Sequence, residues 1–365
     1  MAQHPLHIVH TEASCGWGGQ EIRILTESAG LIGRGHRVTL LCPPEAPICQ
    51  KAAEYGVPVV PLPMAKKRWA GLAAIYRWLK QNRPDIIITH SSTDSWLSAL
   101  AAQVQSPATP VVRVRHISAP VTRNIPTKWL YGTLSRHVVT TGELICDQLV
   151  HHNGIPRSQV SAIPTGIDLQ HFKPGDRQKA REQLGIEAKK VVGIVATLRS
   201  WKGHHYLVEA FAQLQDPDLH LLIVGDGPQR PNLEALIAEQ GVQQRVHMVG
   251  QQKDVVPWLQ AMDLFVLPSY ANEGVPQALM QAMACGLPCL STPAGSIAEI
   301  LHHEQNGLIT EPHSVPLLSA GMERLLGDES LRKELGAAAR QDALRDFGLE
   351  RMLDRMLALI STIIH

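Results

Sequence analysis

Residues 6–42 read LHIVHTEASCGWGGQEIRILTESAGLIGRGHRVTLLC, and this stretch sets the pattern of the whole chain. Two short apolar runs, at 6–11 and 38–42, enclose a glycine cluster at 16–19 and an amphipathic helical stretch at 20–34. Short apolar runs separated by a helical pattern are typical of a βαβ unit, whose parallel strands are buried on both faces. We therefore predict an α/β fold.

The same alternation continues along the chain. Further strand-like runs lie at 57–62, 85–89, 111–115, 137–140 and 160–164 and, after a break, at 191–197, 219–224, 246–249, 264–268, 287–291 and 307–310. Helical patterns between them include 70–81, 203–215, 229–240 and 275–285. About seven strands followed by about six predict two doubly wound, Rossmann-like parallel sheets rather than one. Ligands of such sheets bind at the carboxyl ends of strands, so we expect a ligand in a cleft between two facing domains.

The stretch TGIDLQHFKPGDRQ at 165–178 is rich in glycine, proline and polar residues and lacks periodicity, which marks a break between domains. We predict an N-terminal domain at 1–165, a linker at 166–178 and a C-terminal domain at 179–345. An amphipathic helix at 346–365 follows with no strand after it, and is expected to cap either domain or to pack back on the N-terminal one.

Composition narrows the class of protein. Of 365 residues, 44% are hydrophobic and 18% charged, which excludes a disordered or low-complexity chain. No run of about 18 apolar residues and no secretory signal pattern occurs. The six cysteines are scattered without a C-x-x-C pair, as in a reducing compartment. We expect a cytoplasmic globular protein.

Charge is divided unequally along the chain. Residues 1–172 hold 16 lysines and arginines against 10 acids, and the remainder holds 18 against 23. This asymmetry predicts that one half of the chain meets an anionic surface or substrate, although charge alone does not identify that partner. The few aromatic residues and the lack of a long basic run argue against nucleic acid as the partner.

Two glycine clusters follow predicted strands, where backbone N–H groups can approach a phosphate or a sugar closely. They are Gly16-Trp17-Gly18-Gly19 and Gly225-Asp226-Gly227-Pro228. Neither completes the dinucleotide fingerprint G-x-G-x-x-G, because Glu21 and Arg230 occupy the last position. A dehydrogenase is therefore disfavoured, and each cluster taken alone also fits an ordinary tight turn.

No metal site is predicted. Asp216-Pro217-Asp218 matches the D-x-D pattern of metal-dependent sugar transferases. Here it joins a helix to a buried strand, where Asp and Pro serve as cap and turn formers. The histidine pairs are adjacent in sequence, so they face different ways on a helix and do not chelate.

The sharpest local signal is Glu273-Gly274-Val275-Pro276, directly before the helical stretch QALMQAMACGLPCLST. With Pro276 expected in the first helical turn, a carboxylate and N–H donors would lie together at the helix start. Arg199 and Lys202 follow a predicted strand and would supply cations for a diphosphate. Each of them taken alone also fits surface charge.

Eight stretches of the chain, in order, resemble a family 4 retaining glycosyltransferase of the GT-B fold. They are GWGGQEIRILTESAGLIGRGHRVTLLC, RPDIIITH, VVRVRHIS, VSAIPTGIDLQHFKP, LRSWKGHHYLVEAF, LHLLIVGDGPQRPNLE, WLQAMDLFVLPS and EGVPQALMQAMACGLPCLSTPAGSIAEIL. The resemblance implies transfer of a sugar from a nucleoside diphosphate sugar to an acceptor, with retention of the anomeric configuration. It implies neither a cofactor nor a required metal.

The resemblance also implies roles for single residues. Gly18 and Gly19 match the loop that meets the donor's phosphates, and His116 matches the histidine that touches the donor sugar near the reaction centre. Those expected to line the nucleotide pocket are Gly225, Asp226, Gly227 and Pro228.

The family's charged site maps onto the second half of the chain. Arg199 and Lys202 resemble the basic pair that binds the diphosphate. Glu273 matches the first acid of the family's E-x7-E motif and would hold hydroxyls of the donor sugar. Gly274 and Val275 would offer backbone amides.

Two positions depart from the family pattern. Gln281 stands where the second acid normally accepts hydrogen bonds from the ribose, about two helical turns after Glu273, and its amide can still bond ribose hydroxyls. Thr197 stands where many relatives carry a diphosphate arginine. Arg199 lies two residues on and would point to the same side of an extended chain.

Basic and aromatic residues mix at 66–83 and 123–136. Such segments suit a bilayer with anionic head groups, although ordinary amphipathic helices that pack their aromatics inward give the same pattern. We expect a glycan or lipid-linked acceptor, as in lipopolysaccharide or cell-surface polysaccharide synthesis, with peripheral contact at the inner face of the cell membrane. The alternatives are a catalytically degenerate nucleotide-sugar-binding protein and a nucleotide-sugar 2-epimerase of the same fold.

Overall fold

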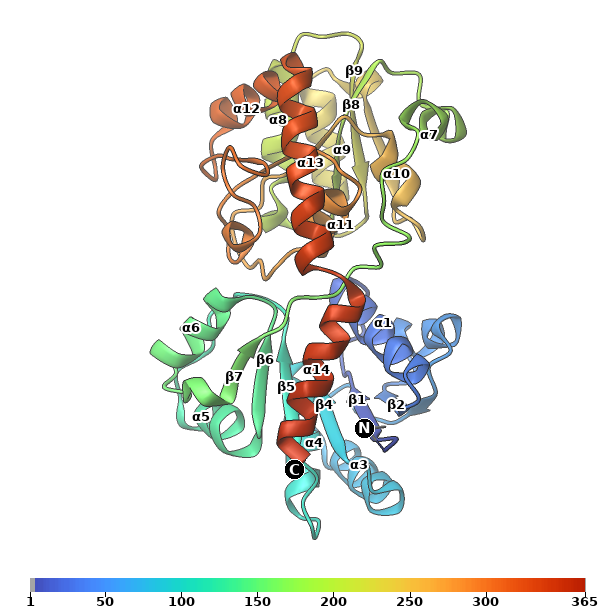
Figure 1. Cartoon of the computed structure of the whole chain (residues 1–365), viewed down its shortest axis with the longest axis vertical. Coiled ribbons are helices and arrows are strands. Elements are labelled where there is room, and N and C mark those ends of the chain that lie inside the picture. The colour runs from blue at the N-terminus through green and yellow to red at the C-terminus, as the bar shows by residue number, and fades with distance from the viewer. Residues whose placement is uncertain (1–3, 365) are drawn as a thin grey trace. The chain divides into compact units, whose positions relative to one another are not determined.

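The computed structural model describes residues 4–364, and these form two parallel sheets, of seven and six strands (Figure 1). One unit holds the chain up to Gly166 together with the residues from Leu349 on, and the other unit is Ile167–Gly348. The predicted fold class, two Rossmann-like α/β units, is confirmed.

The chain enters the second unit earlier than the sequence suggested. The N–H of Ile167 donates to the carbonyl oxygen of Phe347 at 2.7 Å, and Ile167 also pairs with Gly348. The segment predicted as a linker at 166–178 thus lies almost wholly in the second unit, and its end, from Arg177, is already helical.

The first sheet has the strand order β3-β2-β1-β4-β5-β6-β7. Its strands are β1 (His7–Thr11), β2 (Arg37–Cys42), β3 (Val59–Pro61), β4 (Ile86–Thr89), β5 (Val111–Arg115), β6 (His137–Thr140) and β7 (Val160–Ala162). The helices are α1 (Gly19–Gly33), α2 (Pro47–Lys51), α3 (Trp69–Asn82), α4 (Ser92–Gln103), α5 (Ile125–Trp129), α6 (Glu143–His151) and α14 (Leu349–Ile364). Every strand pair is parallel, and the central strands are buried because helices cover both faces.

Helix α14 follows the second unit in the chain but packs on the first. Met352, Leu353, Met356 and Ile360 are buried against residues of the first sheet. At Gly30 of α1 a Cβ would collide with the Leu353 side chain, so glycine permits the close approach of the two helices. The apolar face of α14 is therefore part of the first unit's core.

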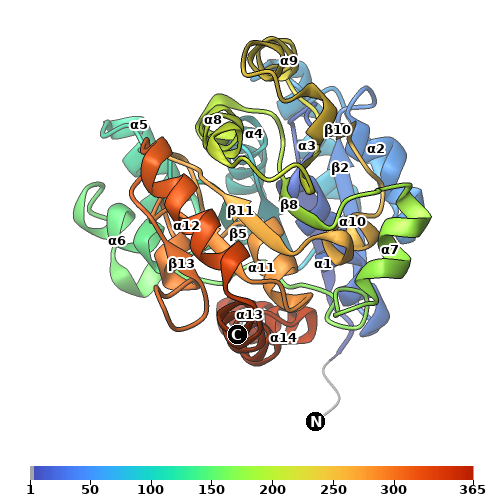
Figure 2. The ribbon, with the colours of Figure 1, turned by 90° about the horizontal axis from the view of Figure 1, so that it is seen from above.

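The second sheet has the strand order β10-β9-β8-β11-β12-β13. Its strands are β8 (Lys190–Val195), β9 (Leu219–Val224), β10 (Val246–Gly250), β11 (Leu264–Leu267), β12 (Cys289–Ser291) and β13 (Leu308–Ile309). The helices are α7 (Arg177–Leu184), α8 (His204–Gln213), α9 (Arg230–Glu239), α10 (Val256–Ala261), α11 (Gln277–Ala284), α12 (Val315–Gly327) and α13 (Glu329–Asp346). Figure 2 shows α8 and α9 on one side of this sheet and α11 and α13 on the other.

Each sheet reverses its strand order at one point, between β1 and β4 in the first and between β8 and β11 in the second. In open α/β sheets, ligands bind beyond the carboxyl ends of the strands at such a switch point. The loops that follow these four strands are therefore where a site is expected in each unit.

Candidate functional site

Lys202 and Glu273 meet at the switch point of the second unit. Lys202 ends a short 3-10 turn, Ser200–Lys202, after β8, and its Nζ lies 2.6 Å from Oε1 of Glu273. Glu273 is only 4% exposed, and Oγ of Ser269 donates to the same Oε1 at 2.6 Å. Oε2 of Glu273 accepts no hydrogen bond from the described residues. One carboxylate oxygen thus fixes Lys202, and the other is left for a ligand.

Glycine lets the loops after β8 and β11 close on each other. Gly203 has φ +73°, and a Cβ there would collide with the carbonyl oxygen of Pro268. The N–H of Tyr270 donates to the carbonyl oxygen of Trp201 at 2.9 Å. These contacts hold Lys202 and Glu273 on adjoining loops.

The start of α11 differs from the prediction. Pro276 is not in the first helical turn: it precedes the helix in an extended conformation, and the helix begins at Gln277. Glu273 therefore lies in a loop, and the eight residues from Glu273 to Gln281 comprise this loop and about one turn of α11 rather than two helical turns. The proline ring fixes φ without forcing a helical ψ, so it suits the N-cap as well as the first turn.

Gly274 and Val275 are buried just before α11, and their backbone N–H groups have no acceptor within residues 4–364. A buried N–H without a partner costs free energy of about 1–3 kcal/mol. These groups also lie at the positive end of a helix. An anionic oxygen bound there would accept hydrogen bonds from these N–H groups, which removes the cost of leaving them unpaired. It would also be stabilised by the dipole of α11.

The loop after β9 packs against the loop after β8. Gly225 has φ +141°, and a Cβ there would collide with the carbonyl oxygen of Ala196. The N–H of Leu198 donates to the carbonyl oxygen of Asp226 at 3.1 Å, while Asp226 and Pro228 remain exposed. The structure thus places the second glycine cluster beside the strand end that carries Arg199.

Arg199 and Gln281 make no described contact with the Lys202–Glu273 pair. Arg199 is exposed, with its guanidinium carbon 5.8 Å from the ring centre of Trp201. Gln281 is half-buried on α11, and its side chain has no hydrogen-bond partner in the part of the chain that the structure describes. Both side chains are available to a ligand.

In the first unit, Gly18 and Gly19 stand at the N-terminus of α1, a helix of 15 residues. Close by is Glu12, which sequence reasoning missed although it directly follows β1. It is fully buried and accepts hydrogen bonds from the N–H of Ser14 at 2.7 Å and from the amide of Gln20. Burial, reinforced by the charge of Asp94, raises the pKa of Glu12 to about 8.

His116 is the outer member of a row of three histidines. Its Nε2 lies 3.0 Å from Nδ1 of His90, and Nε2 of His90 lies 3.0 Å from Nδ1 of His10. Burial is the main cause that lowers the pKa of all three, that of His10 to about 3, so the rings are neutral at neutral pH. The sequence analysis also missed His10 and His90. The one feature that could have indicated them is their position at the carboxyl ends of predicted strands: His10 lies near the end of β1 and His90 directly follows β4.

Asp94 of α4 fixes the loop that carries His90. Its carboxylate accepts from the backbone N–H of His90 at 2.8 Å and from Oγ1 of Thr11 at 2.8 Å. Burial raises its pKa, although these hydrogen bonds act in the opposite direction. The carboxyl ends of β1 and β4 are thereby tied together below the histidine row.

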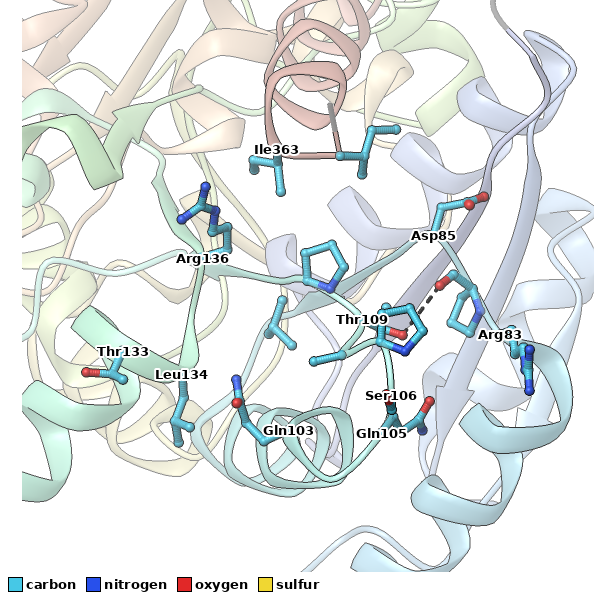
Figure 3. Close-up of a pocket in the computed structure, with 16 residues that line it drawn as sticks. Arg83, Asp85, Gln103, Gln105, Ser106, Thr109, Thr133, Leu134, Arg136 and Ile363 are labelled. Carbon is cyan, nitrogen blue, oxygen red and sulfur yellow. Dashed lines mark hydrogen bonds between the residues drawn. The ribbon is translucent and has the colours of Figure 1, made fainter.

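A cavity of 590 Å³ lies at the amino ends of the strands of the first sheet, opposite the ends that carry the histidine row (Figure 3). Loops before β4, β5 and β6 line it, together with Ile363 and Ile364 of α14. Arg83 and Arg136 lie on different sides of it, so their charges do not converge on one point. This amino-end cavity contains none of the predicted site residues.

The structure gives no metal centre within residues 4–364: no group of three or more His, Cys, Asp or Glu side chains is placed to hold an ion. Asp216 and Asp218 of the D-x-D stretch pair with Lys190 and Lys189, as expected for a turn at the strand start. All six cysteines are free.

A basic-aromatic surface lies on the first unit; its members are Lys66, Lys67, Arg68, Trp69, Trp96, Ile125, Lys128 and Trp129. Trp69 and Ile125 are 84% and 87% exposed. Nζ of Lys67 lies 5.8 Å from the ring centre of Trp96, which in turn is 6.0 Å from that of Trp129. In contrast, Tyr131 is buried in the core, as expected for an amphipathic helix that packs its aromatic residues inward. No helix in the described part of the chain is long and apolar enough to span a bilayer.

Comparison with known proteins covers both units. Residues 17–171 match the model of Glycosyltransferase Family 4, and residues 176–342 match that of Glycosyl transferases group 1. The chain is 29% identical over 227 residues to N-acetyl-alpha-D-glucosaminyl L-malate synthase of Bacillus anthracis, covering 62% of this chain and 59% of that protein. It is 26% identical over 305 residues to the UDP-Gal:alpha-D-GlcNAc-diphosphoundecaprenol alpha-1,3-galactosyltransferase of Escherichia coli, covering 80% and 78%.

The alignments with the first curated relatives span between 51% and 59% of those proteins' lengths. Among solved structures, the Anabaena protein Alr3699/HepE in complex with UDP-glucose has a TM-score of 0.87 at 21% identity, covering 98% of this chain and 100% of that one. At this identity the likeness establishes a common fold.

Proposed function

The chain belongs to the family 4 glycosyltransferases of the GT-B fold, and on that premise we propose that it transfers a sugar from a nucleoside diphosphate donor to an acceptor. The observation that supports this most is the site at the β8–β11 switch point. There, Lys202, Glu273 and the free N–H groups of Gly274 and Val275 combine a cation, a carboxylate oxygen and amide donors.

The chemical demand of such a transfer is to stabilise negative charge on the departing diphosphate. The ammonium of Lys202 has three N–H donors, and Glu273 occupies one of them, so two remain for phosphate oxygens. Arg199 adds a second cation and the start of α11 adds oriented dipoles. Because these groups supply the stabilising field, we propose that catalysis does not depend on a divalent metal.

The other residues are assigned by the same proposal. Oε2 of Glu273 accepts from hydroxyls of the donor sugar, and Gln281 bonds the ribose. In the first unit, Gly18 and Gly19 meet the donor phosphates and His116 meets the sugar. Retention follows the family pattern, in which the acceptor attacks from the face that the leaving group departs and a phosphate oxygen takes its proton.

The proposed transferase activity is tested by measuring turnover of the nucleotide-sugar donor with and without a metal chelator. Nucleoside diphosphates, beginning with UDP, and their sugars are compared by thermal unfolding and by release of free nucleotide. We expect one nucleotide to raise the melting temperature, with a stabilisation of about 2.7 kcal/mol at 100 times its Kd. Activity is expected to survive EDTA. If magnesium or manganese is needed to restore activity, metal independence is wrong, and if no nucleotide binds, the transferase proposal is wrong.

A nucleotide-sugar-binding protein without catalysis is the second candidate, because Gln281 and Thr197 depart from the family pattern. It predicts nucleotide-sugar binding without release of free nucleotide under any acceptor condition. An epimerase of the same fold would instead convert the nucleotide sugar to an isomer in the absence of an acceptor.

We propose that the acceptor is a glycan or a lipid-linked glycan, presented at an anionic membrane during synthesis of lipopolysaccharide or another surface polysaccharide. The E. coli relative carries a diphosphoundecaprenol-linked substrate in its name. The basic-aromatic surface supports membrane contact, because it combines exposed apolar rings with lysine and arginine side chains.

Replacing Lys66, Lys67 and Arg68 by serine is expected to release the protein from anionic vesicles. Each basic residue near such a surface contributes about 1 kcal/mol, so the triple change weakens partitioning by about 10²-fold. Sedimentation with phosphatidylglycerol vesicles at low salt measures the effect, and nucleotide binding should persist.

The control removes the same charge from the second unit, by serine at Lys173, Lys179 and Lys189, which are all exposed. It is expected to sediment like the parent. Equal sedimentation of both triple variants and the parent would rule out contact through the basic-aromatic surface.

A further inference from the structure

The three histidines of the first unit come from three neighbouring strands. His10 lies near the end of β1, His90 follows β4 and His116 follows β5, and the sheet places these strands side by side. Successive rings are stacked, with centroids 5.2 Å and 5.3 Å apart. With one N···N contact of 3.0 Å between each pair, they form a single hydrogen-bonded row.

Counting protons leaves this row only two arrangements. A neutral imidazole has one N–H and one acceptor nitrogen, so three neutral rings carry three protons. Each of the two N···N contacts needs one proton. The third proton therefore sits at one end of the row, either on Nε2 of His10 or on Nδ1 of His116.

The two ends differ in their surroundings. Nε2 of His10 is buried and has no hydrogen-bond partner among the described residues. His116 is half-buried, and its Nδ1 is not among the buried atoms without a partner, so it reaches the surface of the unit. An N–H left unpaired in the interior costs about 1–3 kcal/mol, whereas one at the surface finds water or a ligand.

We propose that His10 and His90 are positioning residues that hold His116 in its Nδ1–H tautomer. In this arrangement Nδ1 of His10 donates to Nε2 of His90, and Nδ1 of His90 donates to Nε2 of His116. Nδ1 of His116 then carries an N–H that points out of the row. At the other end, Nε2 of His10 carries no proton and has only an unpaired lone pair.

The charges around the row keep it neutral and so preserve this count. The guanidinium of Arg23 acts on all three rings, that of Arg113 on His90 and His116, and that of Arg115 on His116. All of them oppose a fourth proton, in the same direction as burial.

The functional meaning of this tautomer rests on the proposed role of His116 at the donor sugar. His116 would donate a hydrogen bond to a sugar oxygen, and it would not act as a base. To accept a proton at Nδ1, the row would have to reverse both hydrogen bonds and leave an unpaired N–H on His10.

The experiment is NMR of the full chain labelled with ¹⁵N-histidine, because the shift of each ring nitrogen reports whether it carries a proton. The His116→Gln variant identifies the His116 signals by their loss. In the parent we expect Nδ1 of His116 to be protonated and Nε2 to be an acceptor. In His90→Phe the partner of Nε2 is lost, and we expect signals of both His116 tautomers.

A second histidine pair supplies the matched control. His220 and His247 in the second unit are stacked, with Nδ1 and Nε2 2.8 Å apart, and His247→Phe should leave the His116 signals unchanged. Protonated Nε2 in the parent overturns the proposal, as does an unchanged His116 tautomer in His90→Phe. If His90→Phe does not fold, the parent spectrum alone decides. The measurement needs no turnover, so its failure is distinct from failure of the transferase assay.

Discussion

Lys202→Ala is expected to lower turnover by about 10²–10³-fold while the protein stays folded. The reason is that Lys202 supplies a fixed donor where charge develops on the diphosphate, and loss of one such donor has this effect in other enzymes. The ion pair with Glu273 already holds the Lys202 ammonium group at this site in the absence of substrate. Steady-state release of nucleotide at saturating donor measures the effect.

The matched control is Lys190→Ala in the same unit. Lys190 also pairs with an acid, Asp216, but at the start of β8 rather than at its carboxyl end. It is expected to keep parental turnover. Thermal unfolding of both variants separates lost chemistry from lost structure, and near-parental turnover in a folded Lys202→Ala protein would remove Lys202 from the site.

Gln281→Ala is expected to weaken binding of the bare nucleoside diphosphate by about 1–3 kcal/mol, which is roughly 5–150-fold. This is the usual cost when a buried polar group loses its hydrogen-bond partner. Gln281→Glu should bind at least as well as the parent, because a carboxylate accepts from both ribose hydroxyls. Glu273→Gln should largely retain binding of the bare nucleotide, because the amide oxygen can still accept a hydrogen bond from Lys202, and should bind the nucleotide sugar poorly. Calorimetric titration compares the three.

Gln183→Ala, on the exposed surface of α7, serves as the control and is expected to bind like the parent. Parental nucleotide affinity in Gln281→Ala would mean that this side chain only packs on α11. Likewise, parental affinity of Glu273→Gln for the nucleotide sugar would mean that Glu273 does not bind the donor sugar.

The fold followed from the sequence because strands buried on both faces leave uninterrupted apolar runs. Runs such as 86–89 and 264–267 are too short for a typical buried helix, and their alternation with helical patterns predicts parallel sheets. The predicted start of α11 was less accurate, because proline is compatible both with the position before a helix and with its first turn. Pro276 occupies the position before the helix.

The site followed only in part. Lys202 and Glu273 stand in loops with recognisable motifs, and the structure brings them together. Glu12, His10 and His90 carry no such motif. What makes them a cluster is the strand order, which puts β1 beside β4 and β4 beside β5, and neither local pattern nor composition contains that order. Their buried polar network could be found only once the sheet was assembled.

The place of α14 has a consequence for the order in which the chain acquires its structure during synthesis. β7 ends at Ala162, but the helix that completes the core of the first unit begins at Leu349. At a translation rate of about 5–20 residues per second, the ribosome needs roughly 10–40 s to make what lies between. Throughout that interval the first sheet lacks the helix that covers one of its apolar faces. The second unit has all of its strands and helices once α13 ends at Asp346, before any residue of α14 is made. The second unit can therefore complete its core before the first unit does, although the first unit is synthesised first.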